Sequence, residues 1–318
     1  MPSDSLSPVG PTRVAIIDIG TNSTRLLVAE VAESRVAELE RISTVTRLGR
    51  GVDHSGQLSD EAIEETCEVI GAYLEVIRGA GVKSPLVVAT SAVRDASNGD
   101  AFAAELRERF ALDLLVLSGD QEARMTYRGA ISGRDEEETL LVVDIGGGST
   151  EMVVGRGVEP TFHTSLQAGV VRHTERLLTS DPPAAEDLES LAGDIHRLIA
   201  EALDGENLPG IDRAVGVAGT PSSLAAMDLE LEPYDSAAVE GHVVELPTIQ
   251  TWLSRLASIP LEERKQVVGL HPDRARPIVA GLVILIEVMR AFDLERIEVS
   301  EHDLLYGLAL TAVRGETP

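Results

Sequence analysis

Two segments of similar sequence carry the residues best suited to phosphate chemistry. Residues 18–28 read DIGTNSTRLLV and residues 144–154 read DIGGGSTEMVV, which gives six identities at a constant offset of 126. Each segment follows an apolar run typical of a β-strand, ends that strand in an aspartate, and continues through a turn of small and polar residues into a second apolar stretch. The sequence therefore predicts an internal repeat whose two copies are β-hairpins.

Each of these turns offers two things that a phosphate site needs. Glycines let successive N–H groups converge on phosphate oxygens without a Cβ in the way, and an aspartate at a strand end can hold Mg²⁺ or its water. Two copies in successive halves of the chain can face each other across a cleft and grip one polyphosphate. The candidate phosphate ligands are Gly20, Thr21, Asn22, Ser23, Gly146, Gly147, Gly148 and Ser149.

Two other phosphate-binding motifs fit the sequence poorly. Only Lys83 and Lys265 are lysines, and neither lies in a GxxxxGK[ST] pattern, so a Walker A loop is absent. A dinucleotide-binding Rossmann turn opens a helix, whereas the residues STEMVV after the second turn continue as a strand. Apart from the two lysines, all of the 27 basic residues are arginines. An anion site would therefore be built from arginine side chains and backbone N–H groups.

The elements that must position these turns alternate between strands and helices, which indicates α/β sheets in both halves. A helix over 59–81 is the clearest, since Ser59 can cap it and its apolar residues lie on one face. Cys67, the only cysteine, falls on that face and is expected in the core. Further strands are predicted over 85–90, 113–118, 161–166, 213–219 and 296–300, and further helices over 100–110, 121–131, 168–178, 185–203, from 220, around Trp252, over 277–292 and from about 301.

Length and composition bound the class of protein. A chain of 318 residues with 43% hydrophobic and 25% charged residues predicts a globular protein of two domains. The net charge of −26 disfavours nucleic acid and anionic membranes as partners. No apolar run approaches the roughly 20 residues that span a bilayer. The polar start, MPSDSLSPVGPTR, lacks the layout of a signal peptide, so we expect a cytoplasmic location.

Besides the two turns, the chain carries a series of further motifs in a fixed order, namely RLG (47–49), ATSAVRDA (89–96), SGDQEA (118–123), SLQAGVVR (165–172), GVAGTPSSLAA (216–226), GLHPDRARPIVAG (269–281) and VSEHDLLYG (299–307). In this order the motifs resemble the exopolyphosphatase and guanosine pentaphosphate phosphatase family, over about residues 14–310. The resemblance implies an α/β fold of two lobes like that of actin, Hsp70 and sugar kinases, a ribonuclease H-like duplication with a phosphate cleft between the lobes. The N-terminal lobe would comprise residues 1–134 and the C-terminal lobe 135–300, with the crossing at RDEEE (134–138) and a C-terminal helix over about 301–318 packing back on the first lobe.

The resemblance gives roles to three carboxylates. Glu122 in SGDQEA matches the family's catalytic base, and its place at a strand-to-helix junction suits a group that orients or deprotonates a water for in-line attack. Asp144 and Glu151 match the family's metal-binding carboxylates and, on two arms of one hairpin, can converge on one Mg²⁺ or Mn²⁺. The alternatives are an ordinary first-turn helix glutamate at 122 and a solvated strand residue at 151.

Three further residues are candidates for phosphate binding. Arg94 in SAVRDA and Arg274 in RARPIVAG match phosphate-binding arginines of the family, although Arg94 could instead pair with Asp95 or Asp120. Thr220 in AGTPSS opens a helix whose N-terminal N–H groups could hold phosphate.

Departures from the family pattern bear on metal and substrate. Arg25 stands at the repeat position of Glu151, so the two copies have diverged and only the second is expected to hold metal. Family members commonly have Arg where this chain has Leu305, which removes one basic contact or ion pair. The acidic surface also suits a short polyanion better than a long one.

We therefore expect a Mg²⁺-dependent exopolyphosphatase that removes the terminal phosphate of short inorganic polyphosphate by metal-assisted attack of water. Guanosine pentaphosphate hydrolysis is the near alternative, and a non-catalytic module that binds polyphosphate or the alarmone is another. An ATP-dependent sugar or acetate kinase is disfavoured by the SGDQEA and ATSAVR motifs. The sequence leaves open the preferred chain length, the hydrolysis of ATP or ADP, and the oligomeric state, for which a homodimer is considered.

Overall fold

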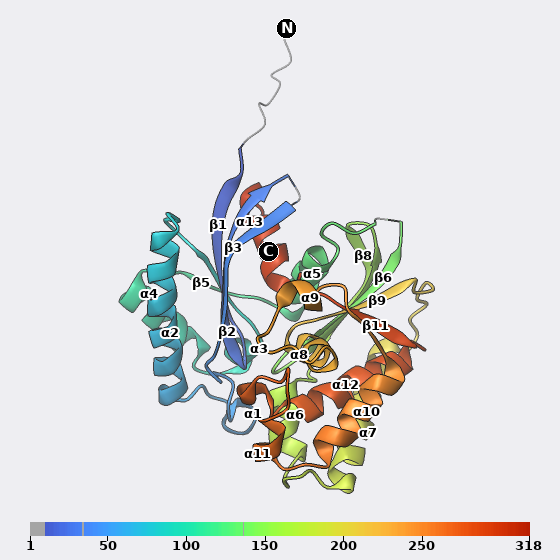
Figure 1. The fold of residues 1–318 in the computed structure, drawn as a ribbon. Helices are drawn as coiled ribbons and strands as arrows, with labels where there is room; N and C mark the ends of the chain where they lie inside the picture. The colour runs from blue at the N-terminus through green and yellow to red at the C-terminus, as the bar shows by residue number, and fades with distance from the viewer. Residues whose placement is uncertain (1–9, 34, 136) are drawn as a thin grey trace.

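The computed structural model describes residues 10–33, 35–135 and 137–318, which form two β-sheets with helices around and between them (Figure 1). Most of the stretch interpreted as lacking a signal-peptide layout, residues 1–9, lies outside the described residues, as does Glu136 in the predicted crossing. We call the first sheet with α1–α4 the first lobe, and the second sheet with α6–α12 the second lobe. The predicted boundary between residues 134 and 135 stays a prediction.

The first sheet has the strand order β3-β2-β1-β4-β5. Strands β1, β2 and β3 are an antiparallel meander, and β4 and β5 run parallel to β1. The predicted hairpin is therefore confirmed, but a third strand extends it that the sequence analysis missed. This strand, β3, is an outer edge strand and mostly exposed, so it lacks the apolar pattern of a core strand. The bounds are β1 Thr12–Ile19, β2 Ser23–Ala32, β3 Arg35–Val45, β4 Leu86–Ala89 and β5 Leu114–Val116.

The second sheet repeats this plan, with the order β10-β11-β9-β6-β7-β8. Strands β6, β7 and β8 are again an antiparallel meander, and β9 runs parallel to β6 as β4 does to β1. The shared plan confirms the predicted duplication, while the short edge strand β10 was not predicted. The bounds are β6 Thr139–Ile145, β7 Thr150–Arg156, β8 Glu159–Leu166, β9 Arg213–Val217, β10 Val243–Glu245 and β11 Arg296–Val299.

Helices of the first lobe cover one face of the first sheet. Helix α2 begins where Ser59 accepts a hydrogen bond from the backbone N–H of Ala62 at 3.2 Å, as its sequence predicts. Its apolar face, with Cys67 on it, packs on β1 and β2. The bounds in this lobe are α1 Val52–Ser55, α2 Asp60–Gly79, α3 Ser91–Asp95 and α4 Gly99–Phe110.

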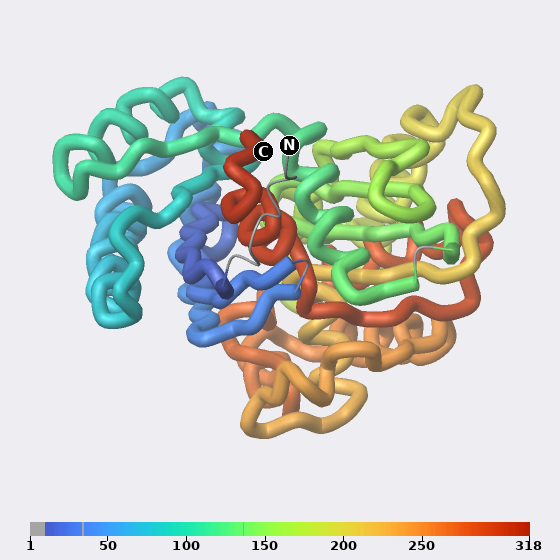
Figure 2. Tube along the Cα trace, turned by 90° about the horizontal axis from the view of Figure 1, so that it is seen from above, coloured from blue at the N-terminus to red at the C-terminus, as the bar shows by residue number. Residues whose placement is uncertain are grey.

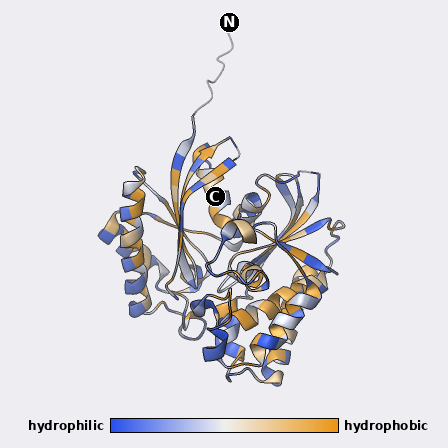
Figure 3. Ribbon diagram, in the orientation of Figure 1, coloured by the Kyte–Doolittle hydropathy of each residue, from blue (hydrophilic) through white to orange (hydrophobic). Residues whose placement is uncertain are grey.

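Helices of the second lobe surround one very apolar helix. Helix α12 is buried on nearly every side among its neighbours, which explains why its sequence is apolar all round instead of on one stripe (Figure 3). The bounds are α6 Val170–Leu177, α7 Ala185–Leu203, α8 Gly219–Asp228, α9 Ser236–Val239, α10 Leu246–Ala257, α11 Leu261–Arg264, the 3₁₀ helix η1 Pro272–Arg274 and α12 Ile278–Ala291.

Two helices, α5 (Gly119–Ala130) and α13 (Leu304–Arg314), lie between the sheets (Figure 2). The apolar residues of α13 pack on the far face of the first sheet, while α5 covers the second sheet. Helix α13 begins at Leu304, three residues later than predicted, because the Asp303 side chain caps it by accepting from the N–H of Leu305 at 3.0 Å.

The two helices cross in direct backbone contact. A Cβ added at Gly129 would lie 2.0 Å from the carbonyl oxygen of Asp303, and one at Gly307 would lie 1.8 Å from the carbonyl oxygen of Met125. Only glycine permits so close an approach at these two positions. The crossing therefore fixes how α5 and the second sheet sit against α13 and the first sheet.

Substitution at this crossing tests the packing. Gly307→Ala should destabilise the protein by about 1–3 kcal/mol, because a methyl group has to be inserted into a contact without free space. The control is Gly193→Ala in α7, where no atom lies within 4 Å of the added Cβ. That change should stabilise by about 0.5–1 kcal/mol by removing a helical glycine. Urea unfolding of both variants measures the difference, and equal effects would contradict the close crossing.

Candidate active site

A cleft opens where β1 and β6, the strands that end in Asp18 and Asp144, meet between the lobes. It encloses about 760 Å³, counting its solvent-open mouth. Most of the predicted site residues line this one cleft, namely Gly20, Thr21, Asn22, Ser23, Glu122, Asp144, Gly146, Gly147, Ser149, Thr220 and Arg274. Gly148, Arg94 and Glu151 are not among its lining residues, but each contacts a residue that is.

The two predicted phosphate turns have the same backbone geometry. The N–H of Gly20 donates to the carbonyl of Ser23 at 3.0 Å, and the N–H of Gly146 donates to that of Ser149 at 2.9 Å. A Cβ added at Gly147 would lie 2.7 Å from the Cβ of Thr21. The turns of the two lobes thus touch, and this contact, more than any special φ angle, requires glycine there.

The strand-end aspartates differ in what stands opposite them. In the first copy, Asp18 is paired across the hairpin with Arg25, whose Nε donates to its Oδ2 at 2.8 Å. In the second copy, Asp144 is paired in the same register with Glu151. Directly opposed residues on an antiparallel pair have neighbouring side chains, and like charges there repel. The repeat has therefore kept its geometry and replaced an ion pair by two acids.

These acids have strongly perturbed acidity. Burial, and then the charge of Asp144, raise the pKa of Glu151 to about 8. Burial also raises the pKa of Asp144 to about 6, against the opposing effect of Arg25. The pKa of Glu122 is raised well above its ordinary value by burial and by the charge of Glu151, with Arg94 acting against both. Three buried carboxylates thus share one site with too little positive charge around them.

Glu122 is held in the first turn of α5 by a capping box. The Ser118 side chain accepts from the N–H of Gln121, and the Gln121 side chain accepts from the N–H of Ser118. One carboxylate oxygen of Glu122 accepts from Arg94 Nη1 at 3.1 Å. The same Nη1 also donates to the carbonyl of Leu117 at 2.7 Å. Arg94 therefore orients the candidate base, a contact that the sequence analysis did not foresee.

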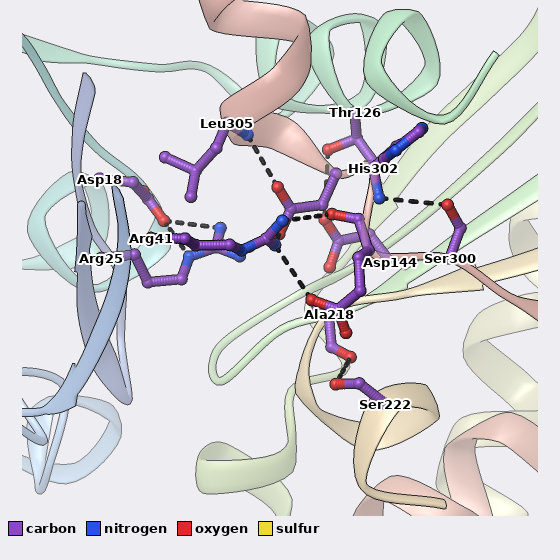
Figure 4. A network of polar contacts seen from close by, with 12 residues as sticks. Asp18, Arg25, Arg41, Thr126, Asp144, Ala218, Ser222, Ser300, His302 and Leu305 are labelled. Atoms are coloured by element: carbon purple, nitrogen blue, oxygen red, sulfur yellow. Dashed lines mark hydrogen bonds and ion pairs between the residues drawn. The ribbon is translucent and has the colours of Figure 1, made fainter. Parts of the chain in front are cut away.

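Arg25 also lines the cleft, although the sequence analysis gave it no role there. It bridges Asp18 and Asp303 in a network that includes Arg41, whose Nη2 lies 3.2 Å from Asp303 (Figure 4). The alignment of the two repeats could have predicted this position of Arg25, because it places Arg25 opposite Asp18, the aspartate that ends the strand before the turn. Leu305 is buried against the first sheet, so an apolar contact stands where the family commonly has arginine.

Arg274 contributes positive charge from the second lobe. Its guanidinium lies against Gly219, where an added Cβ would be 1.4 Å from Nη1. No carboxylate lies within ion-pairing distance of it in the described part of the chain, and burial lowers its pKa. Arg274 is only half-buried and lines the cleft, so its guanidinium is available to an anionic ligand that enters there.

The donor atoms fit a divalent metal. Glu151 Oε2 and Asp18 Oδ1 are buried and accept no hydrogen bond from the residues that the structure describes. Within the same residues, no three metal-ligating side chains are already gathered around one point. Mg²⁺ commonly uses one or two carboxylates and completes its shell with waters and substrate phosphates. Asp144 and Glu151 therefore suit a metal that arrives with its phosphate substrate.

Comparison with known proteins identifies the family. The model of the Ppx/GppA phosphatase family matches residues 13–314. The chain belongs to this family. It is similar to exopolyphosphatase 2 of Mycobacterium tuberculosis, with 34% identity over 94% of this chain and 98% of that one. It is also 29% identical to the guanosine-5'-triphosphate,3'-diphosphate pyrophosphatase of Vibrio atlanticus, over 96% of this chain and 60% of that one.

A solved structure supports the same conclusion. The Ppx/GppA family member of Aquifex aeolicus superposes with a TM-score of 0.81 at 31% identity, over 97% of this chain and 99% of that one. Membership in the family confirms the resemblance drawn from the motifs, the actin-like two-lobed fold, and the assignment as a phosphoanhydride hydrolase. No helix among the described residues is long and apolar enough to cross a membrane.

The acidity of Glu151 predicts how stability depends on pH in metal-free protein. Between about pH 5 and pH 8 the folded state binds more protons than the unfolded state, because the pKa values of Asp144 and Glu151 rise on folding to about 6 and about 8. The free energy of unfolding should therefore decrease as the pH rises through this interval.

Urea unfolding in EDTA at pH 5 and pH 8 measures this change. Glu151→Gln should reduce the loss and make the variant more stable than wild type at pH 8, since a neutral amide carries no charge to bury. Glu159→Gln, at the exposed start of β8, is the control and should behave as wild type. Equal losses of stability between pH 5 and pH 8 in wild type and Glu151→Gln would contradict the assignment.

Proposed function

We propose that this protein is an exopolyphosphatase that removes the terminal phosphate from short inorganic polyphosphate. The observation that carries the proposal is the meeting of three buried carboxylates with two glycine turns and Arg274 at one cleft, which Glu122 and Asp144 line and Glu151 adjoins. The family relationship and the name of the Mycobacterium tuberculosis relative support it.

Phosphate binding and activation of the attacking water are carried out by different groups of residues in this proposal. The N–H groups of the two turns, Gly20–Ser23 and Gly146–Ser149, hold the phosphates from opposite sides, with Thr220 and Arg274 adding contacts from the second lobe. Glu122 orients the attacking water and accepts its proton, since its raised pKa brings it closer to neutral pH. Arg94 holds the Glu122 carboxylate in place.

Asp144 and Glu151 would hold Mg²⁺ or Mn²⁺. When bound, the metal neutralises charge on the phosphate oxygens and polarises the bond to be broken. In its absence, negative charge on these carboxylates repels the substrate that the turns attract, because Asp144 lines the same cleft as the phosphate ligands and Glu151 stands opposite Asp144 on the hairpin. The need for metal therefore follows from the charge of these two side chains.

The net charge of −26 favours a short chain as substrate, because it repels a long polyanion. Hydrolysis of guanosine pentaphosphate is the second candidate, and the similarity to the Vibrio atlanticus enzyme gives it weaker support. That relative is less similar and extends well beyond this chain, whereas the exopolyphosphatase matches along nearly its whole length. The cytoplasmic location and the homodimer stay predictions.

Replacement of the candidate base separates catalysis from binding. Glu122→Gln should lower phosphate release from short polyphosphate by about a hundredfold to ten-thousandfold, the usual contribution of a positioned base. Its affinity for the substrate, measured by calorimetry, should change little because the turns and Arg274 are intact.

The matched control is Asp120→Asn in the same helical turn. Asp120 is an exposed carboxylate outside the cleft lining that pairs with Arg124 at 3.1 Å and with His163 on β8. Wild-type turnover by Glu122→Gln would mean that Glu122 is only a helix-start residue. Tight binding without turnover in wild type would favour the non-catalytic binding protein.

The metal ligands have their own test. Asp144→Asn should abolish most turnover and weaken its dependence on Mg²⁺, since an amide does not neutralise the cation and binds it poorly. EDTA should inactivate the wild type, and added Mg²⁺ or Mn²⁺ should restore it. Phosphate release assays with polyphosphates of defined length, guanosine pentaphosphate and ATP measure both effects. Full activity in EDTA would overturn the role of metal.

A further inference from the structure

Arg172, at the end of the SLQAGVVR motif, has a set of contacts that the proposed function does not use. It lies in the first turn of α6 in the second lobe. Its Nε donates to the carbonyl oxygen of Gly148 at 2.9 Å, its Nη1 to Asp53, and its Nη2 to Asp95 at 2.7 Å. One guanidinium therefore uses three of its donors on three different segments.

These partners belong to both lobes. Gly148 is part of the second phosphate turn, in the same lobe as Arg172, whereas Asp53 lies in α1 and Asp95 ends α3 in the first lobe. In Figure 1, α1 and α6 lie below the crossing of α5 and α13. The crossing and the contacts of Arg172 therefore join the two halves of the molecule at two separate places.

Other polar contacts join the lobes near this point, but they are weaker. Arg47 and Asp273 lie 2.6 Å apart with their side chains 44% and 45% exposed, where solvent and salt screen the pair. The side chains of Arg172, Asp53 and Asp95 are only 16%, 23% and 28% exposed. A forked guanidinium held by two carboxylates at this burial is the strongest of these contacts.

The contact leads directly to the catalytic groups. Asp95 follows Arg94, the residue that holds Glu122. At the start of the same short helix, Ser91 Oγ lies 2.9 Å from Thr21 Oγ1 in the first turn. A Cβ added at Gly148 would lie 2.5 Å from Ser91 Oγ. The contacts of Arg172 with Gly148 and Asp95 thus hold α3 close to the two phosphate turns.

We propose that Arg172 is a positioning residue that clamps the two lobes in the closed arrangement of the phosphate turns. The proposal rests on the proposed function for its effect on catalysis. Opening the cleft breaks the contacts to Asp53 and Asp95 and keeps the one to Gly148. Loss of the clamp therefore lowers the closed fraction of the free protein, and the apparent affinity for substrate falls by the same factor.

The closed fraction can be measured without substrate. Spin labels at Glu75→Cys in α2 and Glu201→Cys in α7, both exposed, report the distance between the lobes, and the native Cys67 is buried. Wild type should give one short distance. Arg172→Ala and Asp53→Asn should each add a longer one, and Arg172→Lys should lie between wild type and Arg172→Ala. Asp53→Asn keeps the bond to Gly148, so it separates clamping from any local support of the turn.

The matched control is Glu61→Gln, which also removes one carboxylate charge. Glu61 pairs with Arg50 within the first lobe, so its loss should leave the distance unchanged. Distance distributions of Arg172→Ala and Asp53→Asn identical to that of wild type would overturn the clamp. A Glu61→Gln variant whose lobes open as far as those of Asp53→Asn would overturn the clamp as well.

Kinetics with short polyphosphate give the second readout. Asp53→Asn should raise KM about fivefold and Arg172→Ala about tenfold, with kcat within about twofold of wild type, because saturating substrate closes the cleft by itself. A fall in kcat without a rise in KM would contradict the clamp. If the lobes open as expected but wild type releases no phosphate, the clamp stands and the proposed function fails.

Discussion

The direct contact between α5 and α13 is the constraint on which the rest of the structure depends. Gly129 and Gly307 let the two backbones touch, and each helix is packed on a different sheet. The same helices carry or adjoin residues of the site, since Glu122 lies in the first turn of α5 and Asp303 caps α13. One backbone contact therefore sets both the relation of the lobes and the distance between the candidate base and the charges around it.

The site concentrates charge that the fold does not neutralise. Arg25 pairs with Asp18 across the first hairpin and with Asp303 at the start of α13, while Asp144 stands opposite a second acid, Glu151, in the other hairpin. Such an arrangement is unfavourable for folding, and in the proposed function a divalent metal would supply the missing positive charge. The duplication made this asymmetry possible, since the two copies differ at one position, which holds Arg25 in the first and Glu151 in the second.

Local rules made much of the fold predictable. The helices with clear apolar faces and caps, such as α2, and the strands with continuous apolar runs, such as β6, follow from local periodicity. The edge strand β3 was missed because its exposed, charged residues follow no apolar pattern. The start of α13 was placed three residues early because the cap at Asp303 is also bound by Arg25 and Arg41, which lie far away in the sequence.

The sequence by itself determined the repeat, the glycine turns, and the three acids, because these depend on residue types and on short spacings. Only the tertiary structure decided what faces each of them. Arg94 was predicted as a phosphate ligand from its motif, which stays a prediction, and the structure adds a contact with Glu122 from another element. The register of β1 and β2 places Arg25 opposite Asp18 at the cleft. Arg172 joins the two lobes through Asp53 and Asp95, which lie 119 and 77 positions away in the sequence. Pairings between distant segments arise from packing, which no local pattern encodes.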